Sequence, residues 1–385
     1  MHPSNRDTRA RGMCRCVIAL LVSVSISCSR QDVPSLSGRV TAGVPIPEES
    51  LSKVLEKHHV PGVSIAVVHR GQVDWTKGYG VCEYGKDGRV DTTTLFQAAS
   101  ISKPVSAVVA LRLVERNELG LDENVNHKLT SWRDPDNEFT KNNPITLRNL
   151  LSHSAGLTMH GVPEFALDEE VPTLIQILDG RWPSAKDSVR LVSKPGSEFR
   201  YSGGGYIVLQ VLLTDVAKRP FAELARELVL KPAGMLSSTF EQPLPRSQWL
   251  HASVGHTGDG TPLRGKWHTL PEQAAGGLWT TPKDLALFMI ALWRSYHGQP
   301  DALLPQHLAS EMLTRQVDDF GLGIALPAVG VFRFQHSGGN AGYRCFMVLS
   351  VDVPDGAVIM TNGDSGEQVI NEVFQAIAHA YGWLV

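Results

Sequence analysis

The sequence predicts an α+β fold, an α/β sandwich in which an antiparallel sheet carries flanking helices and an all-helical insertion. Three observations support this class. Apolar strand-like segments lie near both ends of the chain, hairpin signals accompany them, and segments with helical periodicity fill the middle. Because strands at the two ends need partners, the simplest arrangement pairs them with each other.

The N-terminal part of this sheet follows a helix. Residues 47–59 have the pattern of a charged amphipathic helix, and residues 62–68 (GVSIAVV) form a strand-like run. Residues 69–72 form a turn, and a second strand begins at Val73. These two strands predict a hairpin.

Helical segments dominate the middle of the chain. Thr281 and Pro282 show how one of them begins, because Thr is a favoured N-cap and Pro is favoured at the first helical position. The predicted helices span 105–115, 146–151, 206–218, 221–231 and 282–293. Together they predict the helical insertion.

The C-terminal part of the sheet is a second hairpin. Residues 344–351 and 357–361 are apolar runs, and a turn sequence at 353–356 (VPDG) joins them. A helical pattern follows over 367–381.

The domain organisation follows from these elements. One domain is predicted over 46–385, with a sheet subdomain at about 46–100 and 315–385 and a helical subdomain at about 104–310. The preceding residues 29–45 are polar and contain Gly and Pro, so they are predicted to be a tether.

The N-terminus has the pattern of an export signal over residues 1–28. Four arginines precede a short apolar run at 17–26, and small residues follow at the end of this run. Cys28 then resembles the lipidated cysteine of a bacterial lipoprotein signal, although Ser25 stands where that pattern prefers Leu, Val or Ile. We therefore expect an exported bacterial protein, either periplasmic or held at a membrane by a lipid anchor on Cys28. An apolar run that stays in the membrane is the alternative.

Composition excludes several classes of protein. Of the 385 residues, 42% are hydrophobic and 19% are charged, which is enough for a sizeable core and too apolar for a disordered chain. The net charge is −3 and the charges are scattered, so no nucleic-acid partner is expected. Processing at Cys28 would remove Cys14 and Cys16, and only Cys82 and Cys345 would then remain in the folded body, enough for one disulfide but too few for a Cys/His metal site. We expect neither a metal nor a cofactor.

The first chemical motif is Ser-x-x-Lys at Ser100 and Lys103, directly before an apolar helical run. With Ser100 at the helix start, Lys103 lies one turn further on the same face, with Cβ atoms about 5–6 Å apart. A serine hydroxyl becomes reactive when a base takes its proton, and burial can keep a lysine neutral for this task. The motif thus predicts a nucleophile and its base. An N-cap serine beside a surface lysine is the alternative.

A second copy of this motif shows that the spacing alone is weak evidence. Ser50 and Lys53 lie in a charged segment, ESLSKVLEKHH, whose lysine is expected to stay protonated in water. The copy at Ser100 differs because an apolar helix follows it.

Two further segments lie far from Ser100 in the chain. Residues 199–206 (FRYSGGGY) are a glycine-rich turn that enters a helix, and residues 334–343 (FQHSGGNAGY) end a strand. With residues 145–157 (ITLRNLLSHSAGL), these motifs resemble the serine β-lactamase and penicillin-binding protein superfamily, above all its class C, DD-carboxypeptidase and esterase branch. The resemblance extends from about residue 46 onward and implies a β-lactamase/transpeptidase-like fold.

The resemblance also implies the catalytic roles. Ser100 would be the acylated nucleophile and Lys103 its partner base, while the phenol of Tyr201 would exchange protons with the nucleophile and the leaving group. The backbone N–H groups of Ser100 and Gly339 would form an oxyanion hole, which stabilises the charge that develops in the transition state.

The third motif of the family is Lys-Thr-Gly, which some of its peptidases and esterases have as His-x-Gly. His336, Ser337 and Gly338 match this second form. These residues would bind the substrate. If a charged His336 holds a substrate carboxylate, affinity falls as the pH rises past about 6.5, the usual histidine pKa. A packed sheet histidine is the alternative.

One position departs from the family pattern. The Asn that follows the motif tyrosine by two positions is Gly203 here, and glycine can neither bind a substrate amide nor brace Lys103. This weakens hydrolysis of penicillins and peptides more than that of esters, which have no amide N–H and a better leaving group. The next two residues, Gly204 and Gly205, are expected to serve a tight turn.

Two other features are expected to surround the cleft. His153 is expected to stabilise the loop before Gly156 rather than to take part in catalysis. The segment from Met159 to Lys194, with its Pro and acidic residues, is expected to border the cleft and to influence specificity.

These features together predict an exported serine acyl hydrolase. Its substrate would be an ester, a D-amino-acid peptide or amide, a β-lactam or peptidoglycan-like material. The alternative is a penicillin-binding or wall-associated receptor with little or no turnover, which Gly203 favours. An α/β-hydrolase esterase is excluded because the chain contains no Gly-x-Ser-x-Gly.

Overall fold

The computed structural model describes residues 36, 40–133, 137–184 and 187–384. The predicted signal peptide and the predicted lipid-anchor position at Cys28 lie outside these residues. All described residues belong to one compact unit. Within the described part of the chain, every helix is either too short or too polar to cross a membrane.

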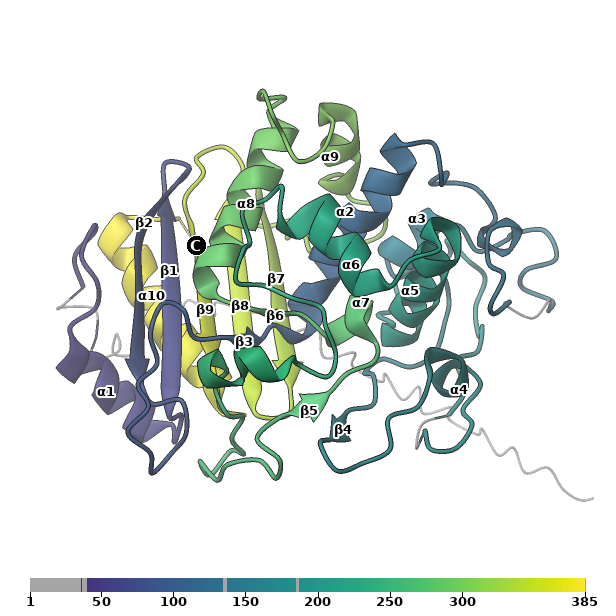
Figure 1. Cartoon of the computed structure of the whole chain (residues 1–385). Helices are drawn as coiled ribbons and strands as arrows, with labels where there is room; N and C mark the ends of the chain where they lie inside the picture. Colours follow the sequence, from purple (N-terminus) through teal and green to yellow (C-terminus); the bar gives the residue numbers. More distant parts are fainter. Residues whose placement is uncertain (1–35, 37–39, 134–136, 185–186, 385) are drawn as a thin grey trace, which may run out of the picture. The chain divides into compact units, whose positions relative to one another are not determined.

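A five-stranded antiparallel sheet joins the two ends of the chain (Figure 1). Its strands, in spatial order, are β2 (Gln72–Gly80), β1 (Gly62–His69), β9 (Gly356–Thr361), β8 (Tyr343–Ser350) and β7 (Arg333–Asn340). The pairing of β1 with β9 runs antiparallel from Val63 opposite Thr361 to Val68 opposite Gly356. The predicted sheet from both chain ends is therefore confirmed.

Helices cover both faces of this sheet. Helix α8 (Pro282–Tyr296) contacts β1, β2, β8 and β9, whereas α1 (Glu48–Lys57) and α10 (Gly366–Tyr381) lie on the opposite face (Figure 1). The hydroxyl of Thr281 accepts from the backbone N–H of Asp284 at 3.2 Å, which confirms the predicted cap of α8. The prediction that placed 282–293 in the helical subdomain is wrong, because this helix packs on the sheet.

The remaining helices lie beside the sheet, next to its edge strand β7 (Figure 1). They are α2 (Ser102–Glu115), α3 (Leu147–Leu151), α4 (Leu174–Leu178), α5 (Gly203–Ala217), α6 (Phe221–Ala225), α7 (Gln273–Gly276) and α9 (Gln306–Met312). The chain also forms short helical turns, which are η1 (Ala99–Ile101), η2 (Val125–His127), η3 (Arg226–Leu230) and η4 (Arg246–His251).

The helical region also contains four very short strands. They pair as β3 (Phe96–Gln97) with β6 (Trp279–Thr280) and as β4 (Phe165–Ala166) with β5 (His268–Thr269). The sequence predicted an all-helical insertion, and these short strands correct that prediction. Two-residue pairings of this kind leave no periodic pattern that a sequence can reveal.

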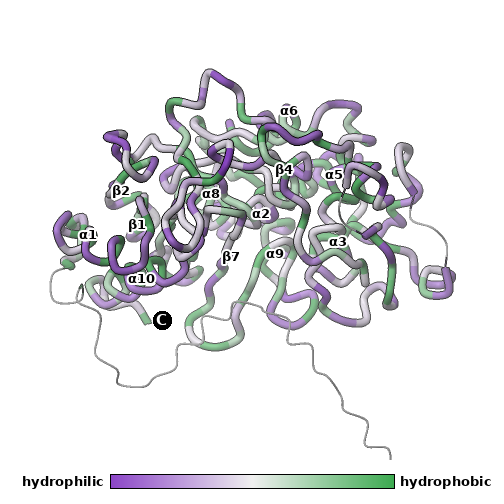
Figure 2. The backbone as a smooth tube through the Cα atoms, turned by 90° about the horizontal axis from the view of Figure 1, so that it is seen from below, coloured by the Kyte–Doolittle hydropathy of each residue, from purple (hydrophilic) through white to green (hydrophobic). Residues whose placement is uncertain are grey.

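The core consists of two apolar clusters, one on each face of the sheet. The larger cluster includes α2 and α5, which are apolar on nearly every side and are almost completely buried. In Figure 2 much of the hydrophilic backbone lies in loops around these elements. The smaller cluster lies between the sheet, α1 and α10, and it includes Leu36 and Val40. The prediction of a tether up to residue 45 is therefore wrong at its end, because packing against the domain begins earlier.

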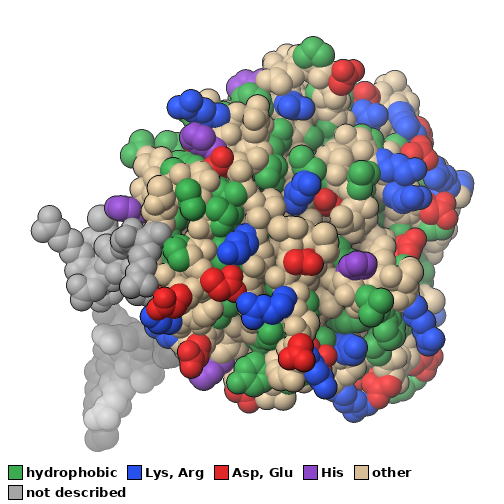
Figure 3. Space-filling view, turned by 60° about the vertical axis from the view of Figure 1, so that its left-hand side comes forward, with side chains coloured by type: hydrophobic (Ala, Val, Ile, Leu, Met, Phe, Trp, Pro, Cys, Tyr) green, Lys and Arg blue, Asp and Glu red, His purple; other side chains and the backbone are tan. Residues whose placement is uncertain are grey.

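The surface carries both signs of charge. On the face shown in Figure 3, acidic and basic side chains are interspersed. The two cysteines of the described part, Cys82 and Cys345, are free thiols, so the disulfide that their number permitted is not formed.

Candidate active site

Ser100 and Lys103 face each other where η1 runs into α2. The ammonium of Lys103 donates to the Ser100 hydroxyl at 3.2 Å and to the backbone carbonyl of Ala275 at 2.7 Å. Lys103 is only 2% exposed. The predicted arrangement of a serine and a buried lysine on one helical face is therefore present.

Burial changes the chemistry of Lys103. Because its apolar surroundings penalise the charged form, the pKa of Lys103 falls from 10.5 to about 7. A substantial fraction of this side chain is then neutral at pH 7 and able to accept a proton. Such a pKa suits a general base that works near neutral pH.

The backbone around Ser100 is held in an uncommon shape. Ala99 has a positive φ of 49°, which costs a residue with a side chain about 1–3 kcal/mol. Strand β7 packs closely against this turn, and a Cβ at Gly338 would lie 2.3 Å from the carbonyl oxygen of Ala98. Glycine at 338 is therefore required for the strand to reach the turn. The thiol of Cys345 donates to the same carbonyl at 3.0 Å.

The phenol of Tyr201 completes a cluster with Ser100 and Lys103. Burial raises the pKa of Tyr201, and a hydrogen bond with Ser100 lowers it only in part. The lysine nitrogen lies 5.1 Å from the centre of the Tyr201 ring. The ring packs against the imidazoles of His153, at 4.2 Å, and His160, at 4.9 Å between ring centres. Tyr201 is therefore a neutral phenol that can donate a proton.

His153 packs against the ring of Tyr201. Its Nδ1 accepts from the backbone N–H of Ser202 at 3.1 Å, and burial, followed by the charge of Lys103, lowers its pKa well below the usual histidine value. It is 2% exposed. This neutral, packed state agrees with the structural role that the sequence predicted.

His336 lies on β7 and is buried as well. Its Nδ1 donates to the carbonyl oxygen of Ser337 at 2.6 Å, while Nε2 has no partner among the described residues. Burial and then the charge of Lys103 lower the pKa of His336 to about 3. Such an imidazole is neutral between pH 5 and 8 in this structure, which favours the packed sheet histidine over a charged His336 that holds a substrate carboxylate.

At alternate positions of β7 the backbone N–H groups point away from β8, toward the outer edge of the sheet. Both backbone groups of Gln335 pair with Ala325, on the side of β7 away from β8. Because backbone direction alternates along a strand, the N–H groups of Ser337 and Gly339 point to this same side. Both residues are exposed. This orientation is the one that the predicted oxyanion hole needs from Gly339.

Several groups near the cluster carried no clear sequence signal. The carbonyl of Ala275 is a backbone group, and any residue would supply it. Glu272 is completely buried, with neither carboxylate oxygen hydrogen-bonded among the described residues, and burial raises its pKa to about 8. His160 and Val162 lie next to Tyr201 and Gly203, respectively. They belong to the segment that was predicted to border the cleft.

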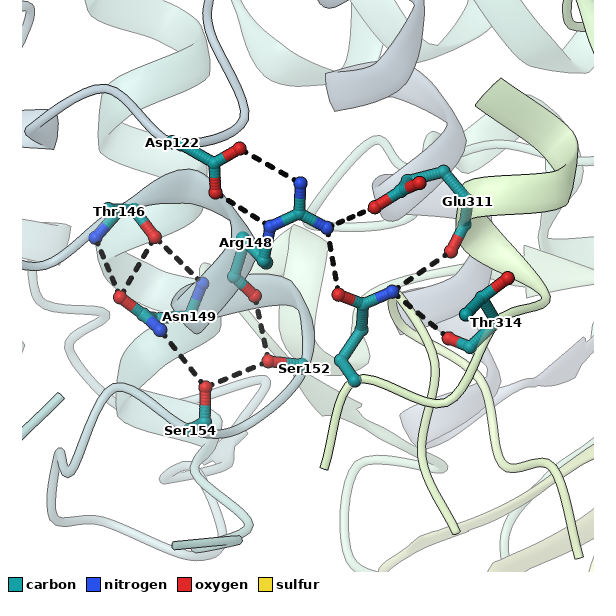
Figure 4. A network of polar contacts seen from close by, with 9 residues as sticks. Asp122, Thr146, Arg148, Asn149, Ser152, Ser154, Glu311 and Thr314 are labelled. Carbon is teal, nitrogen blue, oxygen red and sulfur yellow. Dashed lines mark hydrogen bonds and ion pairs between the residues drawn. The ribbon is translucent and has the colours of Figure 1, made fainter. Parts of the chain in front are cut away.

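A polar network holds the loop that carries His153 (Figure 4). Thr146 and Asn149 form a capping box at the start of α3, and the Asn149 amide also donates to the hydroxyl of Ser154 at 3.1 Å. Arg148 donates to Asp122 at 2.7 and 2.9 Å. It also donates to Glu311 and to the side-chain oxygen of Gln316. This network explains the polar residues of the stretch at 145–157.

Replacing Arg148 by alanine should lower the free energy of unfolding by about 1–2 kcal/mol, because charge-assisted hydrogen bonds to partly exposed partners contribute about this much. Arg148 is 26% exposed. Arg181→Ala is the matched control, since Arg181 is 62% exposed and, among the described residues, forms an ion pair with a single carboxylate, that of Asp179. Denaturant unfolding measures both. Equal effects of the two substitutions would show that the network does not stabilise the loop.

The second Ser-x-x-Lys copy has a different environment. Lys53 is 61% exposed and forms an ion pair with Glu49 at 2.7 Å, on the outer side of α1. Elsewhere in the described residues, no group of three or more His, Cys, Asp or Glu side chains is arranged to hold a metal ion.

The sheet from both chain ends and the serine–lysine pair at the start of a buried helix define the fold of the serine β-lactamase and penicillin-binding protein superfamily. The family model "Beta-lactamase" matches residues 48–381, and the chain belongs to this family.

Known proteins with similar sequence come from bacteria and fungi. Protein flp of Staphylococcus aureus (strain MW2) is 30% identical over 229 residues, which are 59% of this chain and 43% of that protein. Unguisins hydrolase ungD' of Aspergillus campestris is 28% identical over 281 residues, which are 67% of this chain and 48% of that protein. The match thus spans less than half the length of these relatives.

Solved structures share the fold. The hydrolase EstCE1, described as having promiscuous acyltransferase activity, has a TM-score of 0.69 at 21% identity, covering 87% of this chain and 97% of that one. The penicillin-binding protein homologue from Pyrococcus abyssi has a TM-score of 0.69 at 22% identity, covering 87% and 77%. At this identity the likeness concerns the fold.

Proposed function

We propose that this chain is a serine acyl hydrolase that forms an acyl-enzyme on Ser100. The observation that carries the proposal is the buried Lys103, whose nitrogen lies 3.2 Å from the Ser100 hydroxyl and whose pKa is about 7. A neutral amine at this distance can take the hydroxyl proton as the oxygen attacks a carbonyl carbon.

The reaction proceeds in two halves. In the first half, Ser100 Oγ bonds to the substrate carbonyl carbon, its proton passes to Lys103, and the backbone N–H groups of Ser100 and Gly339 stabilise the oxyanion. The bond to the leaving group then breaks, and Tyr201 passes it a proton that Lys103 replaces. In the second half, water attacks the carbonyl carbon of the acyl-enzyme. Lys103 and Tyr201 transfer a proton from this water to Ser100 Oγ, and the carboxylic acid leaves.

Esters are the proposed substrate class ahead of lactams and D-amino-acid amides. Gly203 offers no side-chain amide, so recognition of a substrate amide lacks a partner at this position. Among proteins with a similar fold, EstCE1 is named a hydrolase, and an Ochrobactrum anthropi protein is named a D-amino acid amidase. The N-terminal pattern at 1–28 supports export. A slow or non-hydrolytic penicillin-binding receptor is the second candidate, and Gly203 supports it as well.

Labelling tests the proposal directly. A fluorophosphonate should add mass to Ser100 of the folded protein, and Ser100→Ala should abolish both this adduct and turnover of nitrophenyl esters. Ser50→Ala, in the other copy of the motif, is the matched control and should leave both unchanged. Nitrocefin and D-Ala-D-Ala peptides complete the substrate panel. An adduct without repeated turnover would favour the receptor, and no adduct at all would refute the proposal.

A further inference from the structure

The segment at 158–162 docks on the first turn of α5. The carbonyl of Met159 accepts from Gly204 N–H and that of His160 from Gly203 N–H, both at 3.1 Å. The N-cap hydroxyl of Ser202 donates to the Thr158 carbonyl at 2.7 Å. These bonds satisfy N–H groups that a helix start otherwise leaves free.

This docking depends on glycine, which has no side chain, at positions 203 and 204. A Cβ at Gly203 would lie 2.8 Å from a methyl of Val162 and 3.1 Å from the carbonyl oxygen of His160. A Cβ at Gly204 would lie 2.8 Å from the carbonyl oxygen of Thr158. Real Cβ atoms essentially never approach other atoms to 2.8 Å, so this position of the segment requires glycine at both 203 and 204. The glycines thus serve close approach of a neighbouring segment rather than the tight turn alone.

Val162 is thereby placed beside the reacting groups. One of its methyls faces Gly203, two residues after Tyr201, and the other lies 3.8 Å from the position of a Cβ on Gly276. Gly276 follows Ala275, whose carbonyl holds Lys103. Val162 is partly exposed. It therefore presents an apolar surface beside Gly203 and Gly276, the second of which follows the residue that holds Lys103, and a side chain at 203 has no room there.

We infer that Val162 is a specificity-determining residue, which selects esters of apolar carboxylic acids by contact with the acyl chain. The inference rests on the proposed function and names its substrate class. An apolar acyl chain gains by leaving water against the valine methyls. An acyl group that carries an amide meets no hydrogen-bonding side chain at Val162 or Gly203, and leaving its N–H unpaired is unfavourable.

The first test is Val162→Thr, which keeps the branched shape and replaces a methyl by a hydroxyl. We expect the ratio of kcat/KM for nitrophenyl butyrate to that for nitrophenyl acetate to fall about five- to tenfold, since roughly one buried methyl contact becomes polar. Val171→Thr, at an exposed valine of the same region, is the control and should leave the ratio unchanged. An unchanged ratio in Val162→Thr would overturn the inference.

The second test exploits the coupling of Val162 and Gly203. Gly203→Asn alone should lower ester hydrolysis more than tenfold, because its Cβ displaces the docked segment. The double variant Gly203→Asn/Val162→Ala should recover most of this loss and raise the ratio of nitrocefin to ester turnover about tenfold or more. Full activity of Gly203→Asn alone would overturn the inference.

The outcomes separate this inference from the proposed function. One outcome is that the unaltered protein is labelled at Ser100 and hydrolyses esters while Val162→Thr leaves the butyrate-to-acetate ratio of kcat/KM unchanged. In that case only the inference fails. If the unaltered protein neither labels nor hydrolyses any ester, both fail.

Discussion

Lys103→Met is expected to lower kcat/KM for a nitrophenyl ester by about 10³-fold, within the range that general bases contribute. Methionine has a similar length and suits an apolar site, but it cannot accept the Ser100 proton. In the unaltered protein, kcat/KM should rise about tenfold per pH unit up to pH 7 and then level off. The reason is that the pKa of Lys103 is lowered to about 7, and only the neutral amine acts as a base.

The same substitution should not harm the fold. The pKa of Lys103 is lower in the folded than in the unfolded protein. The free energy of unfolding therefore falls as the pH falls from about 10.5 to 7, and it stays lowered below pH 7. Lys103→Met removes this loss, so the melting temperature at pH 6 should rise. Lys53→Met, in the exposed copy of the motif, should change neither property by much. Retention of a tenth of the activity by Lys103→Met would show that another group is the base.

Tyr201→Phe is expected to lower kcat/KM by about 10²-fold for alkyl esters, near the low end of the contribution of acid catalysis. The phenyl ring keeps its stacking on His153 at 4.2 Å, so the fold should persist. Burial keeps the phenol protonated, which suits it to deliver a proton to the leaving alkoxide. Nitrophenolate needs little such help, so nitrophenyl esters should lose much less activity.

This dependence on the leaving group separates catalysis from packing. A purely structural role for Tyr201 would lower both classes of ester equally. Steady-state kinetics on ethyl and nitrophenyl esters of one acid makes the comparison. Tyr84→Phe is the control, because Tyr84 is 67% exposed and lies outside the cluster.

Local patterns predicted most elements of the fold. The apolar runs and turns of the two hairpins predicted four of the five strands of the sheet, and Thr281 with Pro282 marked the start of α8. The layer to which α8 belongs, however, depends on contacts with β1 and β9, which are distant in sequence. Burial of Leu36 and Val40 is missed for the same reason, because a short polar stretch looks alike whether it packs or not.

The candidate site was predictable to a different extent for each residue. The spacing of Ser100 and Lys103 is local and predicts their contact, whereas the place of Tyr201 and His336 beside them came from the family resemblance. The sequence left two alternatives for His336, a charged substrate-binding group and a packed histidine, because its pKa depends on burial, which the sequence does not show. Ala275 acts through its backbone carbonyl, and Val162 is an ordinary apolar residue. Neither has a sequence signature.

The order of the strands has a consequence for biosynthesis. Strand β1 is among the first parts of the domain to be synthesised, but one of its two neighbours, β9, is made nearly 300 residues later, with β1 at Gly62–His69 and β9 at Gly356–Thr361. A nascent polypeptide interrupted before Gly356 would expose the edge of an apolar strand, and such edges promote aggregation. Premature termination even close to the C-terminus should therefore give an insoluble product rather than a weakened enzyme.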